Sequence, residues 1–404
     1  MVETSPEIKS KQENTANERK KVAVACQGGG MHAAFAVGVL NEILKKVKDE
    51  KFELVGLSGT SAGALVALMV WYGLAPKNGA IGSEDEARRL LKEFWKNFVA
   101  NTPAEAVLNF FTYGTFIAEE AEIPWLGINA PLLGGTFNPY GAIYKAIADG
   151  LPRLGVRPEY FNLRKLLKHY CPKFKDVNWD RVRTRLLIGA SEVVNGFETV
   201  FDSGVNSKLV PENEGMKDRE NYWRQQLPLS LEGVAASGTL PIFRRAQKVT
   251  DEEVDYYWDG LYSHNPPVRD FVRIDKKDYK PDELWIIRIN PQQRGDKAPK
   301  TNASIIDREN ELMGNLSLNK ELDFIMFVNK WCQKHGGKFA EDKKPVTVRT
   351  IKMTKKTADA LHYSSKFDRG RAFMERLRTE GKTVAQSWLN RWPRVGEYPE
   401  DAGY

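Results

Sequence analysis

The sequence is poor in cysteine and has no long hydrophobic run. Three cysteines occur in 404 residues, and they stand far apart at Cys26, Cys171 and Cys332. This spacing fits neither a metal-binding pattern nor a disulfide framework, so we expect no metal, no cofactor and a reducing compartment. No stretch approaches the roughly 18 consecutive apolar residues that a transmembrane helix needs. We therefore expect no membrane-spanning helix.

The first 21 residues are polar and charged, and they lack the apolar segment of a secretory signal peptide. We predict that residues 1–20 are disordered. Together with the sparse cysteines, this segment predicts a cytoplasmic protein whose contact with any membrane is peripheral.

The excess of positive charge is small. The chain has 60 basic and 53 acidic residues, a formal charge of +7. This excess suits a weak preference for anionic surfaces such as lipid headgroups, but it is not the strongly basic footprint of a nucleic-acid-binding protein. With 42% hydrophobic residues, the chain can bury a sizeable core.

Strand and helix patterns alternate near the N-terminus. "KVAVAC" reads as a buried strand, residues 31–47 as a helix, "KFELV" as a strand, and residues from Ala62 as a second helix. This alternation predicts parallel strands in an α/β sheet. Further on, 183–196 and 198–203 read as a hairpin or adjacent strands, and 282–290 as another strand. A mostly helical C-terminal part follows, interrupted by the strand-like "VTVRTIKM".

A serine stands at the turn between the second strand and the second helix, in "GLSGTSAGALVALMVW". The pattern Gly59-Thr60-Ser61-Ala62-Gly63 has the G-x-S-x-G form of a nucleophile elbow. Its glycines allow a sharp turn that exposes the serine hydroxyl. The other interpretation is a helix start of small residues packed against a strand.

Three glycines, Gly28, Gly29 and Gly30, follow the first strand and precede a helix. Backbone N–H groups at such a place can hold an anion, including the oxyanion formed during ester hydrolysis. Gly28, Gly30 and Ala33 also fit the dinucleotide-binding pattern G-x-G-x-x-A. That pattern requires an acid at the end of the next strand, and "LVGLSGTSAG" has none.

The candidate base is an aspartate. None of the five histidines has an elbow-like setting, whereas Asp259 follows a hydrophobic strand and precedes a glycine turn. A partly desolvated aspartate beside a serine can accept its proton, because burial raises carboxylate basicity. The other interpretation of Asp259 is an ordinary turn residue.

Four motifs in order, "CQGGGMHAAFAVGVL", "GLSGTSAGALVAL", "AASGTLPIF" and "WDGLYSHNPP", resemble those of patatin-like phospholipases. The resemblance implies a modified α/β-hydrolase fold: a three-layer α/β/α sandwich with a mostly parallel sheet. It also implies a Ser–Asp dyad of Ser61 and Asp259, an oxyanion hole at Gly28–Gly30, and a lipid or phospholipid substrate.

Two motifs depart from the family pattern. His32 and Ala33 stand where the glycine loop often has arginine and glycine, which leaves details of that loop open. Leu261 stands where a glycine or alanine often follows Asp259-Gly260, and it makes the adjoining loop bulkier. Asn265 and Pro266 fit the family's sequel, and we expect them to brace that loop.

The expected layout is a catalytic domain over 21–291 and a mostly helical C-terminal extension over 292–404, packed on the same domain. Within the first, residues 101–140 are rich in aromatics and are either ordinary packing over the sheet edge or a lid and acyl-chain wall. The leading hypothesis is a serine lipid acyl hydrolase. The alternatives are a catalytically impaired lipid- or partner-binding relative, and an esterase triad that uses His264.

Overall fold

The computed structural model describes residues 19–120, 155–160, 162–210, 223–240, 246–249, 255–273, 279–293, 298–300, 302–335, 344–395 and 397. Nearly all of the N-terminal segment 1–20 and part 121–140 of the aromatic-rich region lie outside these residues.

A mostly parallel sheet forms the centre of the described chain. Seven of its strands follow the order β5–β4–β3–β2–β1–β8–β9, while β7 pairs with both β3 and β6. The pairs β1–β2, β2–β3, β1–β8, β8–β9 and β4–β5 are parallel. The strands are β1 (Lys21–Cys26), β2 (Glu53–Thr60), β3 (Arg185–Glu192), β4 (Glu198–Asp202), β5 (Arg224–Pro228), β6 (Gln247–Lys248), β7 (Tyr256–Asp259), β8 (Glu283–Arg288) and β9 (Thr347–Lys352).

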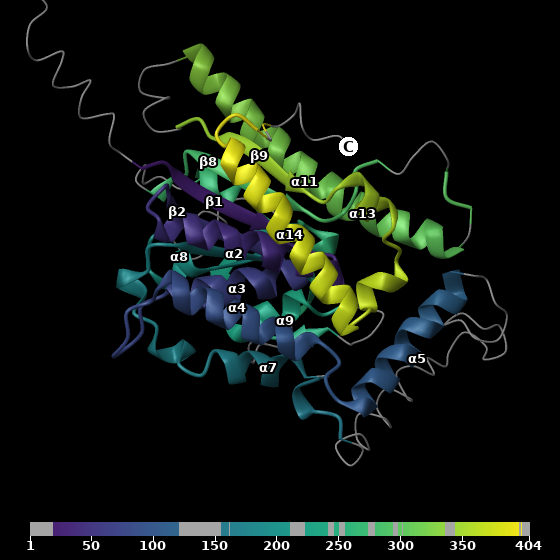
Figure 1. The fold of residues 1–404 in the computed structure, drawn as a ribbon. Coiled ribbons are helices and arrows are strands. Elements are labelled where there is room, and N and C mark those ends of the chain that lie inside the picture. The colour runs from purple at the N-terminus through teal and green to yellow at the C-terminus, as the bar shows by residue number, and fades with distance from the viewer. Residues whose placement is uncertain are drawn as a thin grey trace, which may run out of the picture.

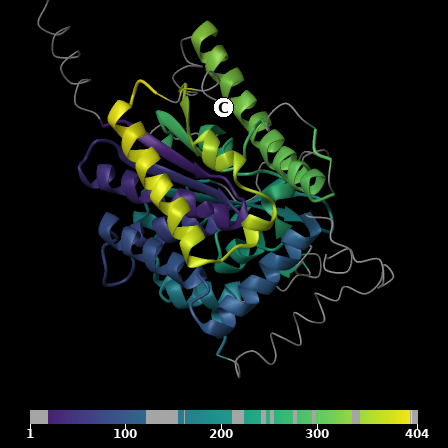
Figure 2. The ribbon, with the colours of Figure 1, turned by 45° about the vertical axis from the view of Figure 1, so that its right-hand side comes forward.

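Helices cover both faces of this sheet (Figure 1). One face carries α2 (Ala34–Lys48), α3 (Ala62–Leu74), α4 (Glu84–Phe98), α7 (Leu163–Tyr170), α9 (Leu231–Ser237) and α14 (Arg371–Arg391). The other face carries α10 (Asp270–Arg273) and α11 (Asn302–His335). In the turned view of Figure 2, α14 and α11 lie on opposite sides of the strands. The predicted three-layer α/β/α architecture is therefore confirmed.

The residues of β1 show why its sequence is apolar throughout. Val22, Val24 and Cys26 pack into the core under α2 and α3, while Ala23 and Ala25 pack under α11. Successive side chains of a strand point to opposite faces, so a strand covered on both sides needs a continuous apolar run.

Local signals also set the helices. Ser83 caps α4 by accepting a hydrogen bond from the N–H of Glu86, and three acidic residues occupy the first turn. The helix α3 is apolar on every side and is buried almost completely between the sheet and α4.

The C-terminal part completes the sheet. The strand β9 pairs in parallel with β8, and α14 packs along α2. The strand-like "VTVRTIKM" therefore belongs to the central sheet, and the part of the chain after residue 291 contributes more than helices packed from outside. Short helices α8 (Ser203–Asn206) and α13 (Lys355–Asp359) lie in connections.

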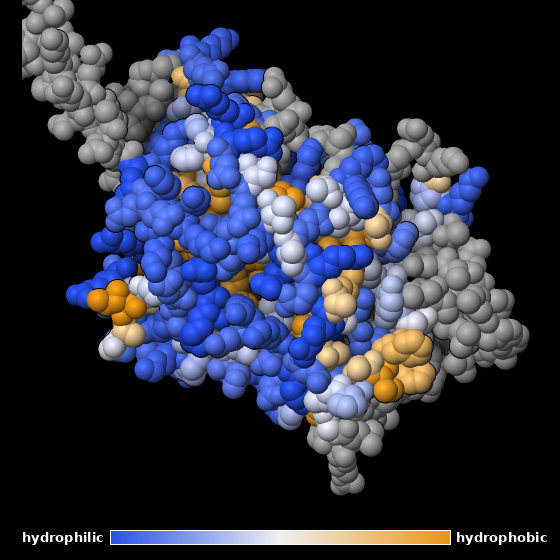
Figure 3. All heavy atoms as spheres, in the orientation of Figure 1, coloured by the Kyte–Doolittle hydropathy of each residue, from blue (hydrophilic) through white to orange (hydrophobic). Residues whose placement is uncertain are grey.

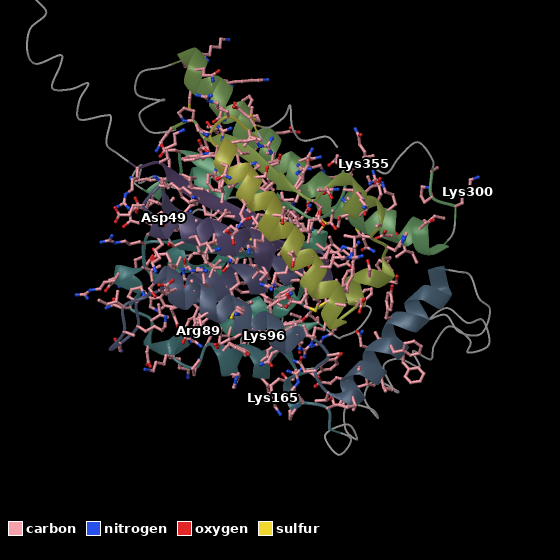
Figure 4. The ribbon with its side chains drawn as sticks, in the orientation of Figure 1. Asp49, Arg89, Lys96, Lys165, Lys300 and Lys355 are labelled. Carbon is pink, nitrogen blue, oxygen red and sulfur yellow. The ribbon has the colours of Figure 1, made fainter. Side chains whose placement is uncertain are left out.

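The face seen in Figure 3 is mainly hydrophilic, and Arg89, Lys96 and Lys355 lie on the surface in Figure 4. Apolar surface gathers over α5 (Pro103–Glu120), where Phe110 and Phe111 are exposed. Within the described ranges, none of the helices combines the length and apolar character that a membrane span requires.

Candidate active site

Two strand ends meet along β3 and bring the predicted nucleophile and base together. Thr60, at the end of β2, pairs with Gly189 of β3, and Asp259, at the end of β7, pairs with the next residue, Ala190. Since β4 occupies the other edge of β3 at this position, β7 lies on the same side as β2. Ser61 and Asp259 therefore face each other across the carboxyl edge of the sheet, although 198 positions separate them in the sequence.

Ser61 occupies a strained backbone conformation at the start of α3. Its φ is 56° and its ψ is −129°, a region that residues with a side chain rarely adopt. A Cβ atom on Gly59 would lie 2.4 Å from the carbonyl oxygen of Gly63, and one on Gly63 would lie 2.2 Å from that of Cys26. The glycines thus permit the turn that the elbow pattern predicts. The N-terminus of α3 also places positive potential at Ser61.

Asp259 is fully buried beside this turn. Its Oδ1 accepts a hydrogen bond from the N–H of Leu261 at 2.9 Å. Within the described chain, Oδ2 has no partner at ordinary hydrogen-bond geometry. Burial raises the pKa of Asp259 to about 7, although the nearby Ser61 hydroxyl and the Leu261 amide act in the opposite direction. The carboxylate is thus unusually basic, and its Oδ2 is available to accept a proton.

The glycine-rich loop adjoins both residues. The N–H of Gly28 donates to Oδ1 of Asn265 at 2.6 Å, which removes it as a free oxyanion donor in this conformation. For Gly29 and Gly30, no hydrogen bond of the N–H group occurs within the described residues. The amides of Gly29 and Gly30 therefore remain the candidate donors of the predicted oxyanion hole.

Several polar residues hold this geometry, and the sequence pattern predicts a bracing role for Asn265 alone among them. Asn290 donates to the carbonyl of Gly28 at 2.8 Å, and Gln27 accepts from the amides of Ile289 and Asn290. The hydroxyl of Ser237 accepts from the N–H of Ser61 at 2.9 Å. Asn265 braces the glycine loop in addition to following the Asp259 turn. Gln27, Ser237 and Asn265 lie within the family motifs, which mark their positions but not these contacts, and no local pattern marks Asn290.

A cavity of about 330 Å³ opens onto the predicted centre. Its lining contains Ser61, Asp259 and all three glycines of the loop, so the structure brings the sequence-predicted residues into one site. The remaining walls come largely from the C-terminal part, among them Asn310 and Met313 of α11.

A second cavity of about 210 Å³ also reaches Ser61, from the side of α3. Its walls are mainly apolar and include Leu65, Leu163 and Leu166. Asn109 and Thr112 of α5 line it as well, so the described part of the aromatic-rich region borders this cavity. Phe110 and Phe111 on the same helix are 71% and 62% exposed and do not form its wall.

His264 does not take the position of a triad histidine. Its ring is buried, and Nε2 donates to the carbonyl of Thr199 at 3.0 Å. Burial and the nearby Arg224 lower its pKa. The Asp259 carboxylate instead accepts from the N–H of Leu261 and lies near the Ser61 hydroxyl, and His264 is not among its described partners. The geometry gives no support to a Ser61–Asp259–His264 triad.

Among the described residues, no three His, Cys, Asp or Glu side chains gather as metal ligands.

Comparisons with known structures find distant likenesses. VipD from Legionella pneumophila is 12% identical, over 90% of this chain and 67% of its own, with a TM-score of 0.33. The type III effector ExoU is 11% identical over 93% of this chain and 53% of its own, with a TM-score of 0.33. Full-length ExoU from Pseudomonas aeruginosa, solved in complex with SpcU, is 11% identical over 92% of this chain and 53% of its own, with a TM-score of 0.28. The chain thus spans about half the length of ExoU. Likeness at this level does not bear on function, and no protein of curated function matches significantly.

The family comparison is decisive. The sequence pattern described as "Patatin-like phospholipase" matches residues 24–272, which is more than half of the chain and includes the glycine loop, the elbow and the aspartate turn. The chain therefore belongs to the patatin-like phospholipase family.

Proposed function

We propose that this protein is a serine lipid acyl hydrolase of the phospholipase A or carboxylic ester hydrolase type. Ser61 is its nucleophile and Asp259 its base, and the amides of Gly29 and Gly30 form its oxyanion hole. The observation that carries the proposal is that Ser61, held at positive φ, shares a cavity with a buried carboxylate and two amides that have no described partner.

In the first step, the Asp259 carboxylate accepts the proton of Ser61, and Oγ attacks the ester carbonyl. A base whose pKa lies near neutrality combines ionisation at physiological pH with a useful affinity for the proton. The strained turn at Ser61 keeps the hydroxyl directed into the cavity without a conformational change.

The tetrahedral oxygen then accepts hydrogen bonds from Gly29 and Gly30. One such donor typically contributes about 3 kcal/mol to transition-state stabilisation. Protonated Asp259 returns its proton to the leaving alcohol or lysolipid, and water activated by the same carboxylate releases the fatty acid.

The two cavities support a lipid substrate with an apolar acyl chain. Both reach Ser61, and the apolar walls of the second suit a hydrocarbon chain. The exposed Phe110 and Phe111 on α5, which borders that cavity, support a peripheral contact with a lipid surface. The described part of 101–140 thus borders the second cavity through Asn109 and Thr112, while its exposed phenylalanines favour contact with a lipid surface.

The test is labelling with a fluorophosphonate probe, followed by turnover of a short-chain ester. We expect the probe to label the wild-type protein and Ser61→Ala to remain unlabelled. We expect Ser61→Ala and Asp259→Asn to lose at least a thousandfold in kcat/KM. Near-wild-type turnover in either variant would contradict the dyad. A folded wild-type protein without labelling or turnover would favour the catalytically impaired binding protein.

A further inference from the structure

A histidine beside the glycine loop holds a serine from the far end of the chain. His32 lies in the short helical turn Gly30–Ala33, where the family often has an arginine, and its imidazole is buried. Its Nε2 lies 2.8 Å from Oγ of Ser365, in the short helix Ser364–Phe367 between α13 and α14 (Figure 1). The two residues are 333 positions apart.

The direction of this hydrogen bond follows from the other bonds of Ser365. Its Oγ donates to the carbonyl of His362 at 2.6 Å and accepts from the N–H of His362 at 3.1 Å. A hydroxyl has a single proton, so Oγ is an acceptor toward His32. His32 therefore carries a proton on Nε2 and donates it.

A second contact joins the same two segments. Gly30 has a φ of +57°, and a Cβ atom on it would lie 2.3 Å from the carbonyl oxygen of Lys366. The backbone of the glycine loop thus rests directly on the backbone of the short helix. Lys366 in turn forms an ion pair with Asp307 of α11 at 2.8 Å, and both side chains are buried. The short helix is therefore fixed to α11 on its other side.

We infer that His32 and Ser365 form a latch through which the C-terminal part of the chain positions the Gly29 and Gly30 amides for catalysis. This inference rests on the proposed function for its catalytic consequence, but the position of the loop can be measured without activity. His32 and Ser365 act through the loop and are positioning residues. The latch accounts for the histidine at position 32, and it makes the oxyanion hole depend on residues outside the family match.

The catalytic test compares His32→Ala, Ser365→Ala and the double variant. Because the amides contact charge that develops only in the transition state, we expect kcat to fall ten- to a hundredfold with KM within twofold of wild type. The double variant should be no slower than the slower single variant, since either change breaks the same bond. His32→Gln places an N–H near the position of Nε2 and should recover most of the lost rate.

The structural test measures by NMR how fast two hydrogen-bonded amides of the loop exchange with solvent. These are the N–H of residue 28, bonded to Asn265, and the N–H of residue 32, bonded to the carbonyl of Gly29. Both should exchange at least tenfold faster in His32→Ala and Ser365→Ala. They should stay at the wild-type rate in His32→Gln and in Ser387→Ala, an exposed serine of α14 that serves as a matched control.

Unchanged exchange at both amides in Ser365→Ala would overturn the latch, and so would equal losses in kcat from Ser387→Ala. If the wild-type protein shows neither labelling nor turnover, the proposed function fails, and the exchange rates still decide whether the latch exists.

Discussion

At the scale of single residues, burial of Asp259 creates a conflict between folding and catalysis. An isolated aspartate is ionised well below neutral pH, but in this site water is excluded and only the Leu261 amide and the Ser61 hydroxyl oppose the loss of solvation. The same desolvation that disfavours the charge makes the carboxylate a better base. Two measurements separate these effects.

The first is the pH dependence of the reaction. Only the ionised form of Asp259 can accept the Ser61 proton, and its pKa is raised to about 7. We expect kcat/KM for a neutral ester to rise with pH through an inflection near 7 and to level off above about pH 8. A profile that is flat from pH 5 to 9 would contradict an aspartate base with this pKa.

The second is the pH dependence of stability. A raised pKa means that Asp259 favours the folded state at low pH, and that this contribution is lost as pH rises through about 7. Asp259→Asn removes the buried charge and keeps an oxygen for the Leu261 amide. We expect the variant to be more stable than wild type by a few kcal/mol at pH 8 and by much less at pH 5, measured by urea unfolding. An equal gain in stability from Asp259→Asn at pH 5 and pH 8 would contradict a raised pKa of Asp259.

The sequence predicts the residues of the site that lie in short patterns, but not those that support them. Ser61 lies between glycines that its turn requires, and Asp259 precedes a glycine turn. Gln27 and Ser237 lie within family motifs and Asn290 does not, but no pattern indicates the contacts of any of the three, because glutamine, serine and asparagine occur in many settings. The strand order brings Gln27 and Asn290 together at the carboxyl edge of β1 and β8, and the end of α9 brings Ser237 to Ser61. The roles of Ser61, Asp259 and the glycines stay predictions until the variants are measured.

At the scale of elements, α2 and α14 cross at two glycines. A Cβ atom on Gly38 would lie 2.1 Å from the carbonyl oxygen of Arg378, and one on Gly381 would lie 2.1 Å from that of Phe35. The two helix backbones are therefore in direct contact. Since α2 begins immediately after the glycine loop, the crossing also fixes the direction in which the chain leaves the candidate oxyanion hole.

We expect Gly381→Ala to push the two helices apart and to destabilise the protein by about 1–3 kcal/mol, measured as a shift of the urea midpoint. Gly114→Ala in α5 is the matched control, because a Cβ atom there meets nothing within 4 Å. Alanine favours a helix over glycine, so the control should be neutral or stabilising by up to about 1 kcal/mol. Similar losses in both variants would show that the crossing is not the cause.

Elements with strong local signals were predictable, and those defined by distant partners were less so. Helix α4 has an N-cap serine and an acidic first turn, and β1 and β8 are mainly apolar runs of strand length. The sequence "VTVRTIKM" predicts a strand where β9 lies, but nothing in it indicates that this strand pairs with β8 at the edge of the central sheet. That pairing depends on a parallel neighbour reached through the long helix α11.

At the scale of the whole molecule, one buried carboxylate contacts residues near both ends of the described chain. Glu283 at the start of β8 accepts hydrogen bonds from Lys20, Trp285, Arg349 and Trp392, at 2.8–2.9 Å. Burial opposes its ionisation, but these four donors outweigh burial and hold its pKa below the usual range. The strand β8 continues into Asn290, which holds the carbonyl of Gly28. The cluster around Glu283 thus supports the strand that leads to the candidate site.

We expect Glu283→Gln to destabilise the protein by about 3 kcal/mol at pH 7, because it removes the buried anion of the Arg349 guanidinium and leaves that group its longer ion pair with the exposed Glu397, at 3.7 Å. A lowered pKa stabilises the fold above the pKa of the unfolded state, and this contribution is lost as pH falls through the folded value. Urea unfolding from pH 7 to pH 3 should therefore show the difference between wild type and Glu283→Gln shrinking as the solution becomes acidic. Asp359→Asn, which breaks the exposed pair with Lys355, is the matched control and should change stability by less than about 0.5 kcal/mol. If the two variants behave alike, Glu283 is not what ties the N-terminal strand to the C-terminal part of the sheet.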